Sequence, residues 1–216
     1  RRKTVGKGRE SVPGIRCAGT PYDYKPTDKG GKTMTDVRYK ITFFSSWHCG
    51  SGLAAGADTD ELVIKDRDGL PYVPGRTVKG LLREAAAMLA QFMDVPEKSV
   101  HRLFGQGGDS DGFGCRSDVS FTNATLDKGE RDAIISQQLT PHLYRPVAST
   151  AIGADGIAKD HSLRKVETTL PCCVYGTVMN VDERDVEVLT HAFKWIKRMG
   201  LGRNRGYGRC EITKED

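Results

Sequence analysis

Residues 77–92 read TVKGLLREAAAMLAQF, and this stretch holds the clearest periodic pattern in the chain. Apolar residues recur in it at spacings of three and four, which line up on one face of an α-helix. The residues on that face are Leu81, Leu82, Ala85, Met88, Leu89 and Phe92. We therefore expect a helix that begins near Thr77, after the break at Pro74-Gly75, and buries this face.

The segments around this helix alternate between strand-like and helix-like patterns. Strands are predicted at residues 37–47, 61–65, 119–121, 172–178 and 207–212. Two more helices are predicted, one from Pro96 to Phe104 with Gly105 as its C-cap and one at about residues 185–199. This order predicts an α+β fold of the ferredoxin-like, RRM-like type, with helices on one face of an antiparallel sheet.

The composition sets the class of protein. With 216 residues and 38% hydrophobic residues, the chain can build one packed domain of ordinary size. No apolar run approaches the roughly 18–20 residues of a membrane span, and no hydrophobic signal region follows Arg1. The six cysteines contain no C-x-x-C pair, which argues against a zinc knuckle. We expect a cytoplasmic protein with reduced thiols and no membrane partner.

The basic charge is concentrated in the first 33 residues, which contain nine Lys and Arg against three Asp and Glu. The remaining residues are close to neutral, with 24 basic and 25 acidic side chains. We predict that residues 1–33 are a basic arm, either a flexible extension or a linker after an upstream domain, and that residues 34–216 form the folded domain. A nucleic-acid surface on this domain then requires local clusters of basic residues.

The first such cluster is residues 200–209, GLGRNRGYGR. Glycines let the backbone approach a phosphate closely, and guanidinium groups bind its oxygens in pairs. Arg205-Gly206-Tyr207-Gly208 also matches the first half of the K/R-G-F/Y-G/A signature of RNA-recognition domains. The segment predicts RNA contact through Arg203, Asn204, Arg205 and Tyr207; the alternative is a glycine-rich turn with solvated arginines.

The second cluster is on the long helix. Arg76, Lys79 and Arg83 share one helix face near the N-terminus, where the helix dipole favours an anion. We group Thr77 and His48 with the predicted RNA-binding residues; the alternative is an ordinary solvated stripe. Asp58 and Asp60 form a third group, in which one carboxylate can hold a divalent ion or a water beside a phosphodiester. Acids in a turn also occur simply as solvated residues.

Together these segments resemble the RAMP superfamily of CRISPR effector proteins, and in particular the repeating backbone subunit of type III complexes. The resemblance is carried by GSGLAAGADTD at 50–60, DELVIKD at 60–66, PYVPGRTVKGLLR at 71–83, LFG at 103–105 and MGLGRNRGYGR at 199–209. It implies an RRM-like palm that lines up along a guide RNA, next to copies of itself or other RAMP subunits. It also implies a protruding β-hairpin thumb, at about residues 149–165, from which Ile152 would intrude between bases.

The resemblance further implies metal-dependent cleavage of the complementary target RNA at regular intervals. The catalytic and metal-binding residue would be Asp60, with Asp58 as the alternative and Mg²⁺ or another divalent cation as the cofactor. The sequence departs from the family pattern at Glu61-Leu62, where many members have small residues or proline. Three alternatives stay open: a catalytically silent RAMP domain that acts as a scaffold, free or as one segment of a fused single-chain effector; a repeat-RNA processing nuclease with His48 as its catalytic histidine; and a generic RNA-binding module.

Overall fold

The computed structural model describes residues 33–53, 59–93, 95–106 and 116–215. A four-stranded antiparallel sheet forms its centre, with strand order β2-β5-β1-β6. The strands are β1 (Met34–Phe43), β2 (Ser120–Phe121), β5 (Cys173–Asp182) and β6 (Cys210–Lys214). Helices α1 (Gly75–Phe92) and α4 (Val186–Trp195) connect β1 to β2 and β5 to β6. This is the predicted ferredoxin-like connection, in which each helix crosses over to a strand that is not the neighbour of the one before.

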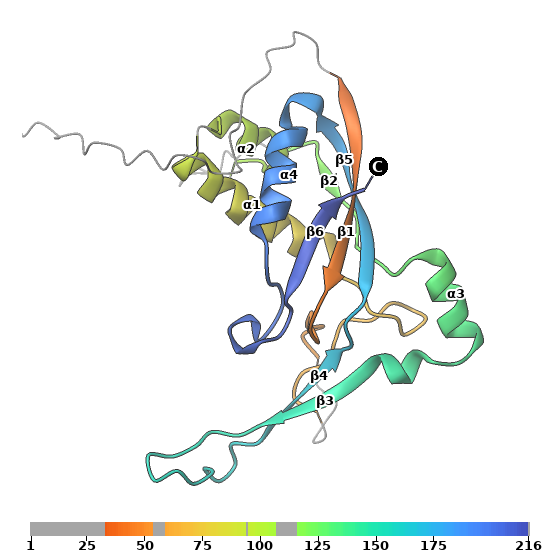
Figure 1. The fold of residues 1–216 in the computed structure, drawn as a ribbon, viewed down its shortest axis with the longest axis vertical. Helices are drawn as coiled ribbons and strands as arrows, with labels where there is room; N and C mark the ends of the chain where they lie inside the picture. Colours follow the sequence, from red (N-terminus) through yellow and green to blue (C-terminus); the bar gives the residue numbers. More distant parts are fainter. Residues whose placement is uncertain (1–32, 54–58, 94, 107–115, 216) are drawn as a thin grey trace, which may run out of the picture.

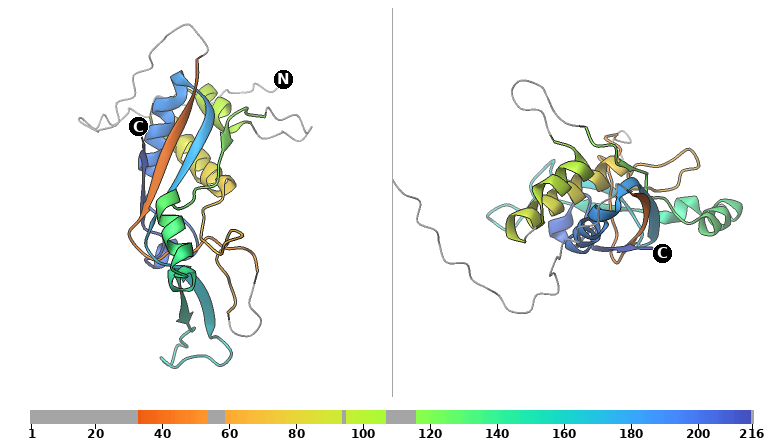
Figure 2. Two further views of the ribbon diagram at one scale, coloured as in Figure 1. Left: turned by 90° about the vertical axis from the view of Figure 1, so that its right-hand side faces the viewer. Right: turned by 90° about the horizontal axis from the view of Figure 1, so that it is seen from above.

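Only one face of this sheet is covered by α1 and α4 (Figure 1). Strand β1 pairs with β5 on one side and with β6 on the other, so it lies in the middle. Its alternate residues Val37, Tyr39, Ile41 and Phe43 are buried, as a strand with one covered face requires. Seen from above, α1 and α4 lie on one side of the sheet and α3 (Lys128–Ser136) on the other (Figure 2).

Helix α1 confirms the predicted periodicity for most of its length. Leu82, Ala85 and Leu89 are buried against the sheet and α4. Met88 and Phe92 were expected on the same face, but they are 38% and 67% exposed. The buried stripe of α1 runs through Val78, Leu82, Ala85, Ala86 and Leu89, and Met88 and Phe92 lie beside it, toward solvent.

Other elements differ from the predictions at their ends. Residues 61–65 form isolated bridges instead of a strand. Helix α4 ends at Trp195 because Lys197 and Met199 pair their backbone with Cys210 and Gly208. Helix α2 (Glu97–Phe104) ends at Gly105 with φ +80°, as predicted. Helix α3 was not predicted, because it has a glycine in its first turn and buries only Ile134.

The remaining elements are short or lie outside the sheet. Three 3₁₀ turns occur at η1 (Thr140–Leu143), η2 (Glu183–Asp185) and η3 (Arg203–Arg205). A separate two-stranded sheet, β3 (Tyr144–Ser149) and β4 (Arg164–Thr169), forms a long hairpin around the segment predicted as the thumb. The described part of the chain has no helix long and apolar enough to cross a membrane. The arm at 1–33 lies outside the described residues except for Thr33, so the domain division stays a prediction.

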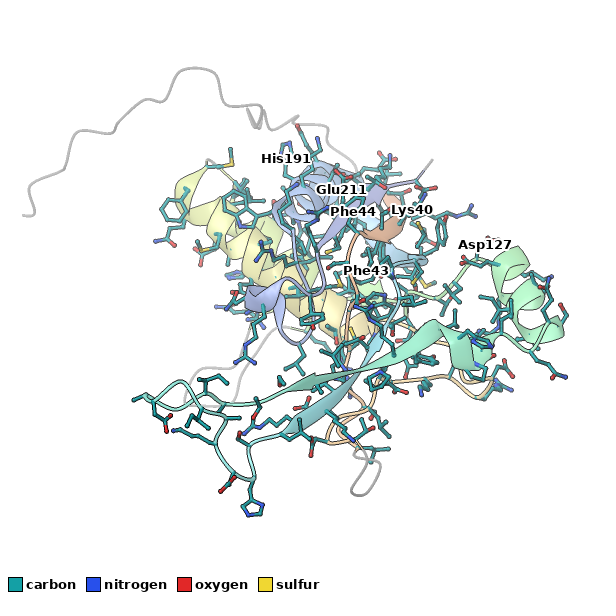
Figure 3. All side chains as sticks on the ribbon, turned by 60° about the horizontal axis from the view of Figure 1, so that its bottom comes forward. Lys40, Phe43, Phe44, Asp127, His191 and Glu211 are labelled. Carbon is teal, nitrogen blue, oxygen red and sulfur yellow. The ribbon has the colours of Figure 1, made fainter. Side chains whose placement is uncertain are left out.

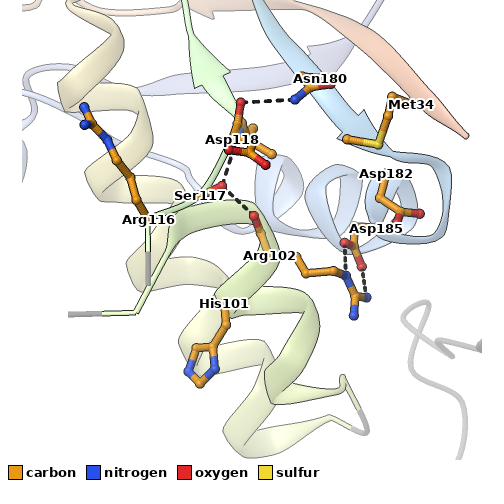
Figure 4. Close-up of a pocket in the computed structure, with 10 residues that line it drawn as sticks. Met34, His101, Arg102, Arg116, Ser117, Asp118, Asn180, Asp182 and Asp185 are labelled. Carbon is orange, nitrogen blue, oxygen red and sulfur yellow. Dashed lines mark hydrogen bonds and ion pairs between the residues drawn. The ribbon is translucent and has the colours of Figure 1, made fainter. Parts of the chain in front are cut away.

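An ion pair joins α2 to the start of α4 at the edge of the body (Figure 4). The guanidinium of Arg102 donates to both carboxylate oxygens of Asp185, at 2.7 and 2.6 Å, and Asp185 is fully buried. Beside it Arg184 holds the pKa of Asp182 down at about 2. Arg102, Asp182 and Asp185, which line the pocket of about 220 Å³ at this place, are therefore already paired. We interpret it as a structural joint.

Two glycines of α1 provide a test of the packing. An alanine at Gly75 would place its Cβ 2.1 Å from the carbonyl oxygen of Phe121, whereas at Gly80 nothing lies within 4 Å. We expect Gly80→Ala to raise the free energy of unfolding by about 0.5–1 kcal/mol, through helix propensity. We expect Gly75→Ala to lower it by roughly 1–3 kcal/mol, because β2 must move. Urea unfolding measures both, and equal stabilisation by the two substitutions would contradict the close approach of β2.

Candidate nucleic-acid interface

A cleft of about 690 Å³ lies between the β3–β4 hairpin and the glycine-rich loop that leads into β6. Its walls come from both hairpin strands and from residues 200–207, with His48 and Glu61 at the base. Arg164, Arg203 and Arg205 line it, against Glu61 as the one acidic residue among the described lining residues. The predicted loop residues Arg203, Asn204, Arg205 and Tyr207 thus all reach one site.

The glycine-rich loop is held in place by its backbone. Leu201 N–H donates to the carbonyl of His48 at 3.0 Å, and Gly208 N–H donates to the carbonyl of Ser46 at 2.8 Å. Gly200 has φ +88°, and an added Cβ would lie 2.3 Å from the His48 oxygen, so the loop can pack this closely only with glycine. The loop backbone is therefore ordered while the side chains of Arg203, Asn204 and Arg205 stay exposed.

Tyr207 differs from the RNA-recognition pattern that suggested it. It lies in the loop before β6, because that strand begins at Cys210 and not at residue 207. Its half-buried ring lies near Gly202 and faces the cleft, not the open face of the sheet. A base that stacked on this ring would lie beside the hairpin.

The basic face of α1 lies outside this cleft. Among the described residues, none of Arg76, Thr77, Lys79 and Arg83 lines it. Desolvation and the nearby charges of Arg83 and Arg116 lower the pKa of Lys79. A cluster of like charges is a place where an anion would be favoured. The structure therefore separates the two predicted basic clusters into two surfaces, and it adds Arg116 to the second.

His48 was predicted to contact RNA, but its side chain is only 2% exposed. Its Nδ1 lies 2.6 Å from the carbonyl oxygen of Glu167 in β4, and its Nε2 lies 3.7 Å from a carboxylate oxygen of Glu61. Nε2 is buried and has no hydrogen-bond partner among the described residues. The ring thus lies beneath the cleft and supports the hairpin, where it is poorly placed to act on a bound molecule.

Asp60 is exposed and lies beside β4 at Lys165, toward the end of the β3–β4 ladder from which the tip leaves. Its N–H donates to the carbonyl of Lys165 at 2.9 Å, and its Oδ2 accepts a hydrogen bond from the N–H of Lys165 at 2.7 Å. Its other carboxylate oxygen has no partner among the described residues. The alternative catalytic residue, Asp58, lies outside the described residues.

The residues around Asp60 show whether a metal ion could be bound there. Among the described residues, no three His, Cys, Asp or Glu side chains come together as a metal site. Mg²⁺ commonly uses one or two carboxylates, keeps several waters and takes further oxygens from a substrate phosphate. One oriented carboxylate with a free oxygen fits that minimal pattern, in which the nucleic acid completes the site.

The hairpin projects away from the sheet (Figure 3). Near its tip, Ile152, Ile157 and Leu163 are 59%, 66% and 60% exposed. Turn hydrogen bonds such as Gly153 N–H to Ile157 O, at 2.8 Å, order the tip. Apolar side chains this exposed on an ordered hairpin can insert between stacked bases or dock on another surface.

The fold also explains three residues outside the cleft, Cys49, Asp66 and Asp68. Cys49 is buried, and desolvation raises its pKa to about 12, so it is a poor nucleophile. Asp66 and Asp68 form ion pairs with Arg131 of α3, and Asp66 also accepts from the N–H groups of Asp68 and Leu70 in its own turn. The sequence analysis did not assign Arg164, Glu61 or Glu167 to the site. They are far along the chain from His48 or from the glycine-rich loop, and local sequence patterns do not show which distant residues come together.

Known proteins share the architecture of this chain. A family model for the RAMP superfamily matches residues 40–211. No curated protein is a significant match. A chain in the cryo-electron microscopy structure of the type III-B Cmr-beta complex bound to cognate target RNA is similar, with a TM-score of 0.65 and 11% identity. The match covers 83% of this chain and 97% of that one.

A chain of the same kind of complex in its apo state has a TM-score of 0.62 and 11% identity, over 83% of this chain and 96% of that one. At this level of identity the two likenesses describe the fold.

The contact between His48 and Glu167 predicts one tautomer. A carbonyl oxygen only accepts, so Nδ1 must carry the hydrogen of the neutral ring and Nε2 must be bare. We expect ¹⁵N NMR of the imidazole to show a protonated Nδ1 for His48, and averaged tautomers for the exposed His161 of the hairpin tip. A His48 ring with a bare Nδ1 and its single hydrogen at Nε2 would contradict the contact.

Proposed function

The chain belongs to the RAMP superfamily, and on that premise we propose that it is a backbone subunit, or one backbone-type domain, of a type III CRISPR effector complex. It binds guide RNA in the cleft and cuts the complementary target RNA at regular intervals with the help of a divalent cation. Its partners are the two RNAs and other RAMP subunits, copies of itself included, in the cytoplasm.

The cleft beside the hairpin is the observation that carries this proposal. Three arginines line it, and an ordered loop with four glycines between residues 200 and 208 forms one wall. Phosphates are bound by such guanidinium groups through pairs of charge-assisted hydrogen bonds. The side chains of Arg164, Arg203 and Arg205 have no hydrogen-bond or ion-pair partner among the described residues, so they are available for a ligand.

The hairpin supports the proposed contact with the guide–target duplex. Ile152 at its exposed tip is suited to intrude between bases, since an apolar wedge can partly unstack a base step. A protein that inserts one such wedge per copy along a guide RNA would interrupt the guide–target duplex at even intervals. The regular spacing of the cuts follows from this repetition.

Asp60 is the residue we assign to cleavage. The 2′-hydroxyl beside the scissile phosphate attacks phosphorus, and the 5′-oxygen of the next nucleotide leaves. Asp60 would hold the divalent ion through the carboxylate oxygen that Lys165 does not occupy. When bound, the ion offsets the charge that develops on the phosphate. One carboxylate is a minimal apparatus, so slow cleavage is expected.

The alternatives are weighed by the same residues. A repeat-RNA processing nuclease would need an accessible catalytic histidine, and the burial of His48 argues against it. A silent scaffold, free or as one segment of a fused effector, would use the cleft in the same way and would leave Asp60 without a chemical role.

The binding half is tested by the double substitution Arg203→Ala with Arg205→Ala. Each charge-assisted hydrogen bond contributes roughly 1.5–3 kcal/mol, so guide affinity should fall on the order of 10²-fold or more. The slope of log K against log salt should decrease by about two. The matched control is Arg38→Ala with Arg67→Ala, which removes two exposed arginines outside the cleft. Equal losses in both doubles would overturn the assignment of the cleft.

The catalytic half is tested by Asp60→Asn, in the assembled complex with Mg²⁺ and a guide-complementary RNA. Asparagine keeps an oxygen for the Lys165 N–H but removes the charge, so the fold is retained while the cutting rate should fall by roughly 10²-fold or more. The control is Asp36→Asn, whose carboxylate likewise accepts a backbone N–H, from Asn180.

Three results are distinguishable. Loss of cutting in Asp60→Asn alone, with guide binding retained, agrees with the proposal. Cuts that persist would move the chemistry to Asp58 or to another subunit. A wild-type complex that binds and never cuts would leave the scaffold reading.

A further inference from the structure

Three stretches of chain meet along β4, next to Asp60. Residues 47–51 pair with β4 through the Trp47–Thr169 bridge and with residues 62–64 through the Gly50–Val63 bridge. Residues 60–61 pair with β4 in turn, through the parallel bridge between Glu61 and Val166. None of the three contacts is a regular strand pair, so each is short.

Glu167 contacts all of these stretches. Its N–H donates to the carbonyl of Glu61 at 3.0 Å, and its own carbonyl faces Nδ1 of His48. One carboxylate oxygen accepts from the N–H of Val63 at 3.1 Å, and the other accepts from Nζ of Lys65 at 2.8 Å. The side chain is 16% exposed, which shields these interactions from solvent.

Lys65, the partner of Glu167 in this ion pair, is itself held in place. Nζ of Lys65 lies 4.0 Å from the ring centroid of Tyr144, at the start of β3, and the Tyr144 hydroxyl donates to the carbonyl of Gly69 at 2.6 Å. The Glu167 carboxylate therefore joins β4, the 61–65 segment and β3. Since both its oxygens are already engaged, it is not a free ligand for a cation.

Asp60 lies directly before the clasped segment. Its carboxylate bonds to Lys165, two residues before Glu167 on the same strand. Two attachments thus hold Asp60 against the hairpin: its own bond to β4, and the Glu167 clasp on the next few residues. If the Glu167 carboxylate let go, Asp60 would be held by its two hydrogen bonds with Lys165 and by the backbone bond from Glu167 N–H to the Glu61 carbonyl. Each such bond contributes only about 1 kcal/mol, and only the Lys165 N–H bond reaches the carboxylate itself.

We propose that Glu167 is a positioning residue, which locks the Asp60 segment to the hairpin so that the carboxylate stays at a constant distance from the wedge. This inference rests on the proposed function. It explains how a wedge and a lone carboxylate on an irregular segment can act at one phosphate. Because misplacement by about 1 Å can lower a rate on the order of 10²-fold, the clasp controls both the rate and the position of the cut.

The test compares Glu167→Gln with wild type in the assembled complex, in single turnover with saturating target RNA and Mg²⁺. Glutamine retains one acceptor oxygen but loses the charge that holds Lys65. We expect the cutting rate to fall by roughly 10- to 100-fold. We expect the cuts to spread to neighbouring phosphates, while affinity for guide and target stays within about twofold. The control is Glu211→Gln, an exposed glutamate on β6.

A second pair of variants separates positioning from folding. Lys65→Met should reproduce the spread of cuts, Lys65→Arg should largely restore single cut sites, and Lys65→Met should add little to Glu167→Gln, because both remove one ion pair. A residue that only stabilised the fold would lower the melting temperature without spreading the cuts. Unchanged rate and cut positions in Glu167→Gln, in a complex where Asp60→Asn is inactive, would overturn the inference alone.

Hydrogen exchange provides the readout that does not need cleavage. In Glu167→Ala, which removes both acceptor oxygens, the amides of Val63 and Lys165 should lose protection, whereas the amide of Ile41 in the centre of the sheet should keep it. Unchanged protection at Val63 would overturn the clasp. A wild-type complex that never cuts would overturn the proposed function and the positioning role with it, and exchange would then report on the clasp alone.

Discussion

Trp47 joins the core of the sheet to the base of the hairpin, and the candidate site depends on this connection. Its fully buried ring stacks on Phe43, the last residue of β1, with centroids 4.4 Å apart. Its backbone exchanges two hydrogen bonds with Thr169, and its indole N–H donates to the carbonyl of Leu170. The hairpin is therefore attached next to β1, whose inward-facing residues lie in the core.

The residues that directly follow Trp47 in the sequence connect it to the rest of the site. The ring of His48 contacts the backbone of β4, and its carbonyl accepts a hydrogen bond from Leu201 N–H of the glycine-rich loop. The carbonyl of Cys49 accepts from Ile64 N–H and so holds the segment that follows Asp60. One short stretch after β1 thus organises both walls of the cleft and the strand that carries Glu167. The exposed arginines and Asp60 need only modest local order of their own, because the backbone beneath them is already placed.

The division between packing and chemistry explains why polar groups near the cleft differ in their roles. The Glu167 carboxylate and Nδ1 of His48 are paired within the protein, where leaving a buried group unpaired would cost about 1–3 kcal/mol. Arg164, Arg203, Arg205 and Asp60 keep polar atoms that no described residue satisfies. In a protein that binds an anionic polymer, such unsatisfied exposed groups are where ligand contacts are expected.

Local sequence patterns by themselves predicted α1, α2 and α4 and the segments of β1, β2, β5 and β6 in their order along the chain, the residues of α1 that are buried around Leu82, Ala85 and Leu89, and the basic, glycine-rich loop. These features depend on residues near one another along the chain. Family motifs directed attention to Asp60. Only the tertiary structure decided that Met88 and Phe92 are exposed, that His48 is buried, that the basic face of α1 lies outside the cleft, and that Glu167 reaches Val63 and Lys65. Those outcomes depend on contacts between residues about 100 positions apart, such as Lys65 with Glu167, and no local pattern contains that information.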